Sequence, residues 1–476
     1  MASKTTLNAR NLEQLGAGRL AELLIEVSAG NAGAKRKLRL ELAGAKSPKE
    51  AERTIAKRLT SIANARSRIG RKTSKAFVDD LDTQRRGIVD RVAPQDPASA
   101  LMLMWRFMTL ANPVIERCRG SDDVVIMVFR AACADLGGLV AAARPDRGAL
   151  VESVFDALSD NRFGQYSGLI ARLGPALGPE GLEQLRQRFD ARLKEQEAAE
   201  AAVDRSGPPT PAQDLPGIEA RRQQSIARRA LLDLADAQGD VDAYIAHVPP
   251  AMRRRPATAI AIARRLVAAG RAARALRVLD DAQPAEHDPD RRAWQDARLE
   301  GLEALGRHEA AQAFRWACFE RDLSADHLRA YLARLPDFDD IEAEDLAMGV
   351  VMGERDLGAA LRFLLDWRSP ARAAELLVRR QPEIDGNAWA ILSPAADALA
   401  AGHPLAATLA LRAMIDTTLC EGRSNRYRHA ARHLATCAGL ADRVADFGAF
   451  EPHDAYLARL RRDHGRKPGF WSLVDG

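Results

Sequence analysis

Two histidines and a cysteine stand at helical spacing near the end of the chain. His429, His433 and Cys437 follow one another at intervals of four residues, and two histidines four apart on a helix can chelate zinc. A metallohydrolase helix also carries a glutamate between its histidines, whereas residues 430–432 are Ala, Ala and Arg. The rise of a helix places Cys437 about 12 Å from His429. We therefore expect no metal site here.

A second zinc-like beginning, His308-Glu309, fails for a related reason. Gln312 stands where the second histidine is required. The chain also has no Gly-rich phosphate loop, no Gly-x-Ser-x-Gly elbow and no kinase-like set of motifs. We expect no cofactor and assign no catalytic residue. An enzyme stays open as an alternative, because the members of a Ser-His-Asp triad come from distant positions in a sequence.

Basic charge is concentrated in residues 34–75. This segment holds 14 Lys and Arg but three acids, a net charge of +11, while the whole chain carries +5. The remaining residues together are therefore negative, and the positive charge is local. The candidate residues for binding a macromolecule are Lys35, Arg36, Lys37, Arg53, Lys57, Arg68, Arg71 and Lys75.

Helical spacing predicts a cationic ridge on a helix over residues 48–75. On an ideal helix the ridge gathers within about 60° of one direction, and it comprises Arg53, Lys57, Asn64, Arg68, Arg71 and Lys75. Ile55, Leu59, Ile62 and Ile69 lie opposite, and Gly70 can bend or end the helix. Such a ridge suits phosphates, an acidic protein face or anionic lipid, or it is a solvated face. No aromatic residue precedes Phe77, so base stacking is not indicated.

Six acids within nine residues form a counterpart in the second half of the chain. They are Asp337, Asp339, Asp340, Glu342, Glu344 and Asp345. The spacing is not that of a calcium loop. It favours a loop that enters a helix, where acids interact well with the helix dipole; binding a cation or docking the basic ridge stays open.

The elements that carry these residues are predicted to be helices. Hydrophobic residues make up 47% of the chain but aromatic residues only 5%, with Ala, Leu and Arg abundant, a balance that favours helices over strands. The run Val124 to Phe129 is strand-like, yet its context indicates a buried helix. Helix starts of the Ser/Asp-Pro type recur at Ser47-Pro48, Asp96-Pro97, Asp288-Pro289, Ser369-Pro370 and Ser393-Pro394.

A recurring turn indicates helical repeats. Gly270, Gly306, Gly353 and Gly402 each end one helix before a polar turn opens another, at separations of 36, 47 and 49 residues, which suit stacked helical hairpins. Two pairs resemble tetratricopeptide hairpins, with a Leu-Gly-Arg turn at 305–307 and small packing residues after it. These pairs are Thr258–Ala269 with Ala272–Asp280, and Trp294–Leu305 with Glu309–Phe319.

Domain organisation follows from one Pro- and Gly-rich stretch. Residues 204–217 cannot hold a helix. They follow a helix over 182–203 whose periodicity places Leu182, Leu185, Phe189 and Leu193 on one side. We expect an N-terminal helical domain at 1–203, a linker at 204–217 and a degenerate repeat domain at 218–476. Five scattered cysteines and the lack of any run near the roughly 20 apolar residues of a membrane span favour a cytoplasmic protein.

The first residues carry a family resemblance. Residues 2–12, Ala-Ser-Lys-Thr-Thr-Leu-Asn-Ala-Arg-Asn-Leu, and 20–24, Leu-Ala-Glu-Leu-Leu, resemble an uncharacterised bacterial family, mainly alphaproteobacterial. Residues 122–136, 176–182 and the tail 455–470 resemble helical regions of bacterial SWIM zinc-finger proteins. The finger itself is missing, because no two cysteines are two residues apart. The resemblance implies a helical scaffold and supplies no catalytic residues.

Together these patterns predict an all-α protein, a degenerate tetratricopeptide-like α-solenoid behind an N-terminal helical domain. The expected function is a non-enzymatic scaffold with a protein partner. The alternative is a nucleic-acid-associated protein that binds phosphates through the basic helix 48–75. The sequence does not specify the partner, the pathway or the oligomeric state.

Overall fold

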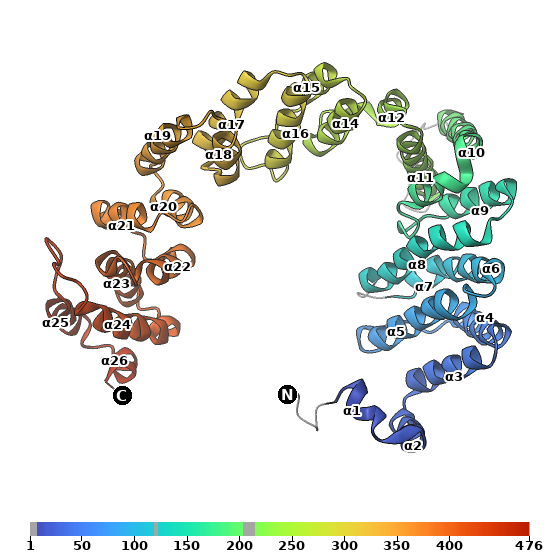
Figure 1. Ribbon diagram of the computed structural model, residues 1–476, viewed down its shortest axis with the longest axis horizontal. Coiled ribbons are helices and arrows are strands. Elements are labelled where there is room, and N and C mark those ends of the chain that lie inside the picture. The colour runs from blue at the N-terminus through green and yellow to red at the C-terminus, as the bar shows by residue number, and fades with distance from the viewer. Residues whose placement is uncertain (1–6, 119–121, 203–214, 476) are drawn as a thin grey trace. The chain divides into compact units, whose positions relative to one another are not determined.

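The computed structural model describes residues 7–118, 122–202 and 215–475, and within them the protein is built from helices (Figure 1). In this described part, β pairing is limited to one isolated bridge between Ile69 and Cys118. The all-α fold class predicted from composition is confirmed. The run Val124 to Phe129 is helical, as expected.

The chain falls into two compact units, Met1–Ala269 and Gly270–Gly476. The helices of the first unit are α1 Ala9–Glu13, α2 Gly16–Ser28, α3 Ala32–Lys46, α4 Pro48–Asn64, α5 Arg71–Gly87, the π-helix η1 Ile88–Val92, α6 Pro97–Met108, α7 Ala111–Ile115, α8 Asp122–Ala143, α9 Arg147–Ser159, α10 Leu169–Ala202, α11 Leu215–Gln238, α12 Val241–His247, α13 Pro250–Arg253 and α14 Pro256–Ala268.

The second unit contains helices of similar length. They are α15 Ala272–Asp280, α16 Arg291–Ala304, α17 His308–Asp322, α18 Ala325–Leu332, α19 Asp339–Gly353, α20 Leu357–Asp366, α21 Pro370–Arg379, the 3₁₀-helix η2 Gln381–Glu383, α22 Trp389–Leu399, α23 Pro404–Cys420, the 3₁₀-helix η3 Ser424–Arg426, α24 Tyr427–Ala441, α25 His453–His464 and α26 Pro468–Val474.

Packing within the second unit is between near neighbours along the chain. The helices that touch extensively are consecutive, or have one α-helix between them, as α20 with α22 and α24 with α26. Each helix is too short to bury its apolar face alone, so adjacent helices bury one another's apolar faces along the unit. This pattern defines a helical-repeat solenoid, and the predicted hairpin near Gly306 is present as α16 and α17.

The predicted glycine turns lie at helix ends. Gly270 and Gly306 have φ of 72° and 69°, a left-handed conformation that suits glycine and closes a helix. The amide of Arg307 donates to the carbonyl of Leu302 at 3.0 Å, which completes the cap. Gly353 ends α19 and Gly402 lies between α22 and α23.

Three of the five predicted helix starts are present in the structure. Ser47, Asp96 and Ser369 each precede a proline in the first turn of α4, α6 and α21. The start predicted at Asp288-Pro289 is wrong, because α16 begins at Arg291. Pro394 lies inside α22, where burial of Leu392, Ala395 and Leu399 on one face outweighs the missing hydrogen bond.

The single helix predicted over residues 48–75 is also wrong. Helix α4 ends at Asn64 and α5 begins at Arg71. A tertiary contact explains the break. The Arg117 guanidinium donates to the carbonyls of Ala65 at 2.5 Å and Ile62 at 3.3 Å, and the Ile69 amide donates to the Arg117 carbonyl at 3.0 Å. These bonds satisfy the end of α4, so the helix stops there.

The predicted boundary at 204–217 does not coincide with the division between the units, which falls after Ala269. Residues 203–214 lie outside the described part, and α11 begins at Leu215. The helices on both sides of this segment share one hydrophobic core, which includes Leu185 and Phe189 of α10 and Leu231 of α11. Leu182 and Leu193, predicted on the same apolar side, are also buried.

Helix α8 corrects the expectation that no segment approaches the length and composition of a membrane span. Its segment Asp123–Ala143 is long and apolar enough to cross a membrane by length and composition, with a mean hydropathy of 1.9. Val125, Phe129, Leu136 and Val140 of this helix lie in the core of the first unit. A buried core helix can have the same composition as a membrane span, and these contacts account for the apolar residues that α8 buries.

Candidate functional site

The predicted basic residues are distributed over three helices and one loop. Helix α3 carries Lys35, Arg36 and Lys37, α4 carries Arg53 and Lys57, the loop 65–70 carries Arg68, and α5 carries Arg71 and Lys75. All of these side chains except the half-buried Arg36 are exposed. The continuous ridge predicted from Arg53 to Lys75 does not form, because the chain leaves the helix after Asn64.

A buried carboxylate joins the three helices. Asp80 of α5, whose side chain is only 2% exposed, accepts from Arg36 Nε at 3.1 Å and from Arg58 Nε at 2.9 Å. Gln84 Nε2 also donates to it, at 3.4 Å. Burying a carboxylate requires such compensation. Arg36 and Arg58 are therefore partly structural, which sequence spacing could not indicate.

A groove of about 270 Å³ lies between α3 and α4, and we call it the α3–α4 groove. Its lining includes Arg36 and Arg39 of α3 and Thr54, Lys57, Arg58 and Ser61 of α4. Arg58 is held at its floor, since Nη1 donates to Ser61 Oγ at 3.1 Å while Nε binds Asp80. Among the described residues, the groove thus combines four cations with one carboxylate, that of Asp80, beneath them.

Other basic candidates face elsewhere. Lys37 lines a separate cavity of about 600 Å³ together with Asp79, Asp82 and Asp90. Arg53 donates to Glu50 at 3.1 Å on the exposed side of α4. Of the residues predicted from sequence, the groove brings together Arg36 and Lys57. Arg39 and Arg58 were not singled out, because only the packing of α3 on α4 places them beside Lys57.

The acidic stretch forms the entry to α19, as expected. Helix α19 begins at Asp339, and its first turn holds Asp339, Asp340 and Glu342. Glu344 accepts from Trp367 Nε1 at 2.7 Å and Asp345 pairs with Arg372 at 2.7 Å, which holds α19 against the next two helices.

Phe338 is unusual in this entry. Its side chain is 78% exposed, and its φ of 78° is left-handed, a conformation that costs a non-glycine residue roughly 1–3 kcal/mol. Ile341 and Leu346 are exposed nearby, at 60% and 67%. We call residues 337–346 the Phe338 surface. Neither the strain nor the exposure of Phe338 helps the protein to fold.

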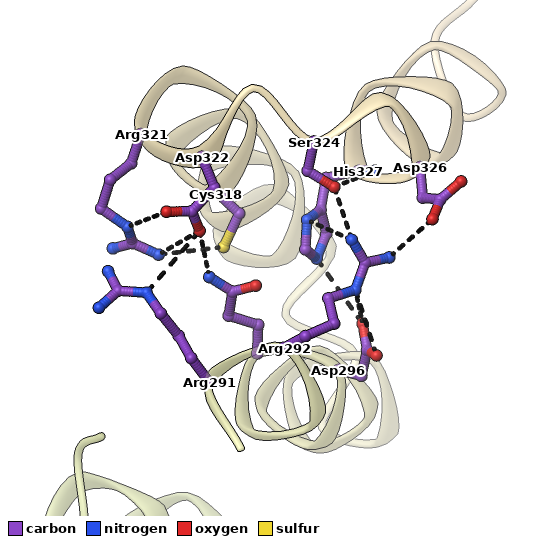
Figure 2. A network of polar contacts seen from close by, with 10 residues as sticks. Arg291, Arg292, Asp296, Cys318, Arg321, Asp322, Ser324, Asp326 and His327 are labelled. Carbon is purple, nitrogen blue, oxygen red and sulfur yellow. Dashed lines mark hydrogen bonds and ion pairs between the residues drawn. The ribbon is translucent and has the colours of Figure 1, made fainter. Parts of the chain in front are cut away.

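A polar network connects α16, α17 and α18 (Figure 2). His327 is 2% exposed, and its Nδ1 lies 3.4 Å from Arg292 Nη1 while Nε2 lies 3.7 Å from Asp296 Oδ1. Because arginine only donates, Nδ1 is the acceptor and Nε2 carries the proton. Burial lowers the pKa of His327, and the Arg292 cation lowers it further. The ring is therefore held neutral.

Asp322 forms the second half of the network. It accepts from Gln295 Nε2 at 2.6 Å and from Arg321 Nε at 3.3 Å, and Figure 2 shows Arg291 approaching from α16. Burial opposes its ionisation, but the donors Gln295 and Arg321 lower its pKa on balance. These contacts fix α17 to α16.

A buried cation lies in the core between α23, α24 and α25. Arg412 is 6% exposed, donates through Nη1 to the Glu451 carbonyl at 2.6 Å, and lies 4.3 Å from the centre of the Tyr456 ring. Burial lowers the pKa of Arg412. Tyr456 donates to Asp416 at 3.1 Å, and burial raises its pKa well above the usual value. Burial also raises the pKa of Cys437 to about 12, so this thiol is not a nucleophile at neutral pH.

The zinc-like spacing does not assemble a site. On α24, Tyr427–Ala441, His429 is exposed, whereas Cys437 is buried with its Sγ 4.0 Å from the Thr408 carbonyl. Cys420 Sγ lies 3.9 Å from His464 Nε2 instead. Across the described ranges, no group of three or more His, Cys, Asp or Glu residues could hold a metal ion.

Comparisons with known proteins give a family but no activity. No curated protein matches the chain. A solved structure titled "Circular tandem repeat protein with novel repeat topology and enhanced subunit contact surfaces" aligns with 13% identity over 94% of this chain and 95% of that chain, with a TM-score of 0.16. The model of a family of unknown function, DUF6880, matches residues 2–473. The chain belongs to this family of unknown function.

Proposed function

We propose that the protein is a non-enzymatic helical-repeat scaffold that binds a protein partner at the Phe338 surface. The observation that carries this proposal is Phe338, which combines a 78% exposed aromatic ring with a left-handed backbone. Glycine would adopt this conformation at less cost and would expose no apolar ring. Aromatic residues, phenylalanine included, are enriched in protein interfaces relative to the rest of the protein surface.

The charge around Phe338 suggests the chemistry of the partner. Asp337, Asp339, Asp340 and Glu342 are exposed and surround the ring in the sequence, while Glu344 and Asp345 are engaged within the protein. A partner segment with basic residues beside an apolar pocket would match this surface. The unpaired cysteines support a cytoplasmic setting for the interaction.

The test is affinity purification with two variants of the tagged full chain. Phe338→Gly removes the ring and relieves the strained backbone, so the variant should be at least as stable as the natural protein. Met102→Ala is the control, because Met102 is 65% exposed on α6 and far from α19 in the sequence. A partner enriched over a tag-only sample should be lost with Phe338→Gly and kept with Met102→Ala. Recovery of the same partners with Phe338→Gly would contradict the proposal, as would no enrichment at all.

A further inference from the structure

The α3–α4 groove holds more positive charge than the fold needs. Arg36, Arg39, Lys57 and Arg58 line it, and the buried Asp80 compensates one of these four charges. A net charge of about +3 therefore faces the groove. Concentrating like charges on one small surface destabilises the folded protein, so a bound anion is the simplest reason to keep them there.

Three of the four cations have donors available. Arg58 is occupied by Asp80 and Ser61, whereas Arg36 donates to the described residues only through its Nε, which binds Asp80. That bond orients the Arg36 side chain and leaves its two terminal nitrogens free to bind. Arg39 and Lys57 are exposed and form no ion pair among the described residues. At the base of the groove, Arg58 is therefore fixed by its hydrogen bonds. Arg36, Arg39 and Lys57 line the same groove with donors that are free to bind a ligand.

The cations continue along both helices beyond the groove. On α3, Lys35, Arg39 and Lys46 fall on one exposed stripe. On α4, Lys49, Arg53 and Lys57 form a second, in which Arg53 pairs with Glu50. Cations four residues apart on a helix are separated by a rise of about 6 Å, so Lys35 and Arg39, or Arg53 and Lys57, can contact successive phosphates. The nearby acid Glu41 is neutralised by Arg91. A row of cations longer than the groove suits an extended polyanion better than a single small anion.

We propose that the α3–α4 groove binds the phosphate backbone of a nucleic acid without sequence preference. None of the described residues that line the groove is aromatic, so stacking on bases contributes nothing. Arg and Lys contacts to phosphates carry no sequence information. This site is independent of the Phe338 surface, which lies in the other unit. An anionic membrane is the competing partner, because α2 exposes Leu24, Ile25 and Val27.

The experiment measures binding of the full chain to a labelled mixed-sequence DNA duplex and to a single-stranded RNA by fluorescence anisotropy. The groove variant is Arg39→Glu with Lys57→Glu, which spares the pairs with Asp80. The matched control is Arg254→Glu with Arg466→Glu, two exposed arginines outside the groove with the same total change of charge. Circular dichroism checks that all three proteins are equally helical.

Three phosphate contacts predict a loss of affinity of roughly 40-fold between about 50 and 200 mM salt. The groove variant should bind at least about 10-fold more weakly than the natural protein at low salt, with a shallower salt dependence, while the control stays within about threefold. Absence of binding at low salt, or equal loss in the groove variant and the control, would overturn the proposal. So would groove-dependent binding to phosphatidylserine vesicles by a protein that ignores both nucleic acids.

Discussion

Arg36 Nε donates to Asp80 Oδ1 at 3.1 Å, although 44 residues separate the two side chains in the sequence. The contact joins α3 to α5, and Arg58 brings α4 to the same carboxylate. A segment that the sequence presents as uniformly cationic is therefore divided in the folded protein. Part of its charge holds three helices together, part is free in the α3–α4 groove, and part faces elsewhere, as Lys37 does.

The first prediction concerns this ion-pair cluster. Asp80→Asn leaves Arg36 and Arg58 partly buried without a carboxylate, so the free energy of unfolding of the first unit should fall by about 3 kcal/mol. Chemical denaturation followed by circular dichroism measures the loss. Asp79→Asn is the control, because Asp79 is the exposed neighbour and its replacement should change little. Equal stability of the two variants would contradict a structural role for Asp80.

Local sequence patterns predicted the elements that depend on local physics. Ser47 accepts from the Glu50 amide at 3.3 Å and Asp96 accepts from the Ser99 amide at 3.0 Å, so the helix starts at Pro48 and Pro97 are visible in the sequence. The apolar side of α10, with Leu185 and Phe189 buried, follows from helical periodicity in the same way.

Features that depend on distant residues were not predictable. The end of α4 depends on Arg117, 52 residues beyond Ala65, and no pattern within residues 48–75 indicates that contact. The groove depends on α3 lying against α4, which places Arg39 beside Lys57. Likewise, the sequence showed the acids around Phe338 but not the left-handed backbone that exposes the ring.

The second prediction is a dependence on pH in α16–α18. His327 is kept neutral by burial and by Arg292, and Asp296, Asp322 and Asp326 are the acids that face it. Since its pKa is lowered in the folded protein, the unfolded chain binds the proton more readily. The resulting stability is present above the ordinary histidine pKa of 6.5 and is lost as the pH falls through the depressed pKa of the folded protein.

Urea denaturation at about pH 7.5 and about pH 5.5 measures this loss. His327→Gln keeps an acceptor for Arg292 and has no group that is protonated in this pH range, so it should lose less stability on acidification than the natural protein. His287→Gln, at an exposed position, should behave like the natural protein. If His327→Gln shows the full acid sensitivity, the buried histidine is not its source.

The third prediction concerns thiol reactivity. Burial raises the pKa of Cys437 from 9.0 to about 12, so the folded protein holds roughly 1,000-fold less thiolate there at mildly alkaline pH than an ordinary cysteine. Cys420 is exposed and should be alkylated first. The folded protein is treated with iodoacetamide and then digested, and mass spectrometry of the peptides shows which cysteine is alkylated first. Urea-unfolded protein is the control in which both cysteines react. Equal rates in the folded protein would exclude a sealed core around Cys437.

Because its pKa is raised, Cys437 also favours folding below about pH 9 and ceases to do so as the pH approaches 12.

The fourth prediction uses two glycines beside neighbouring helices. A Cβ on the buried Gly386 would collide with the Ala413 carbonyl oxygen and the Thr417 hydroxyl of α23, whereas a Cβ on Gly402 would meet nothing. Neither glycine has a positive φ, so backbone strain does not distinguish them. Gly386→Ala must therefore push the segment before α22 away from α23, at a cost of roughly 1–3 kcal/mol in the free energy of unfolding. Gly402→Ala should be neutral or slightly stabilising.

Thermal denaturation of the two variants compares them directly, and equal midpoints would show that the segment at Gly386 does not pack against α23 as closely as the structure has it.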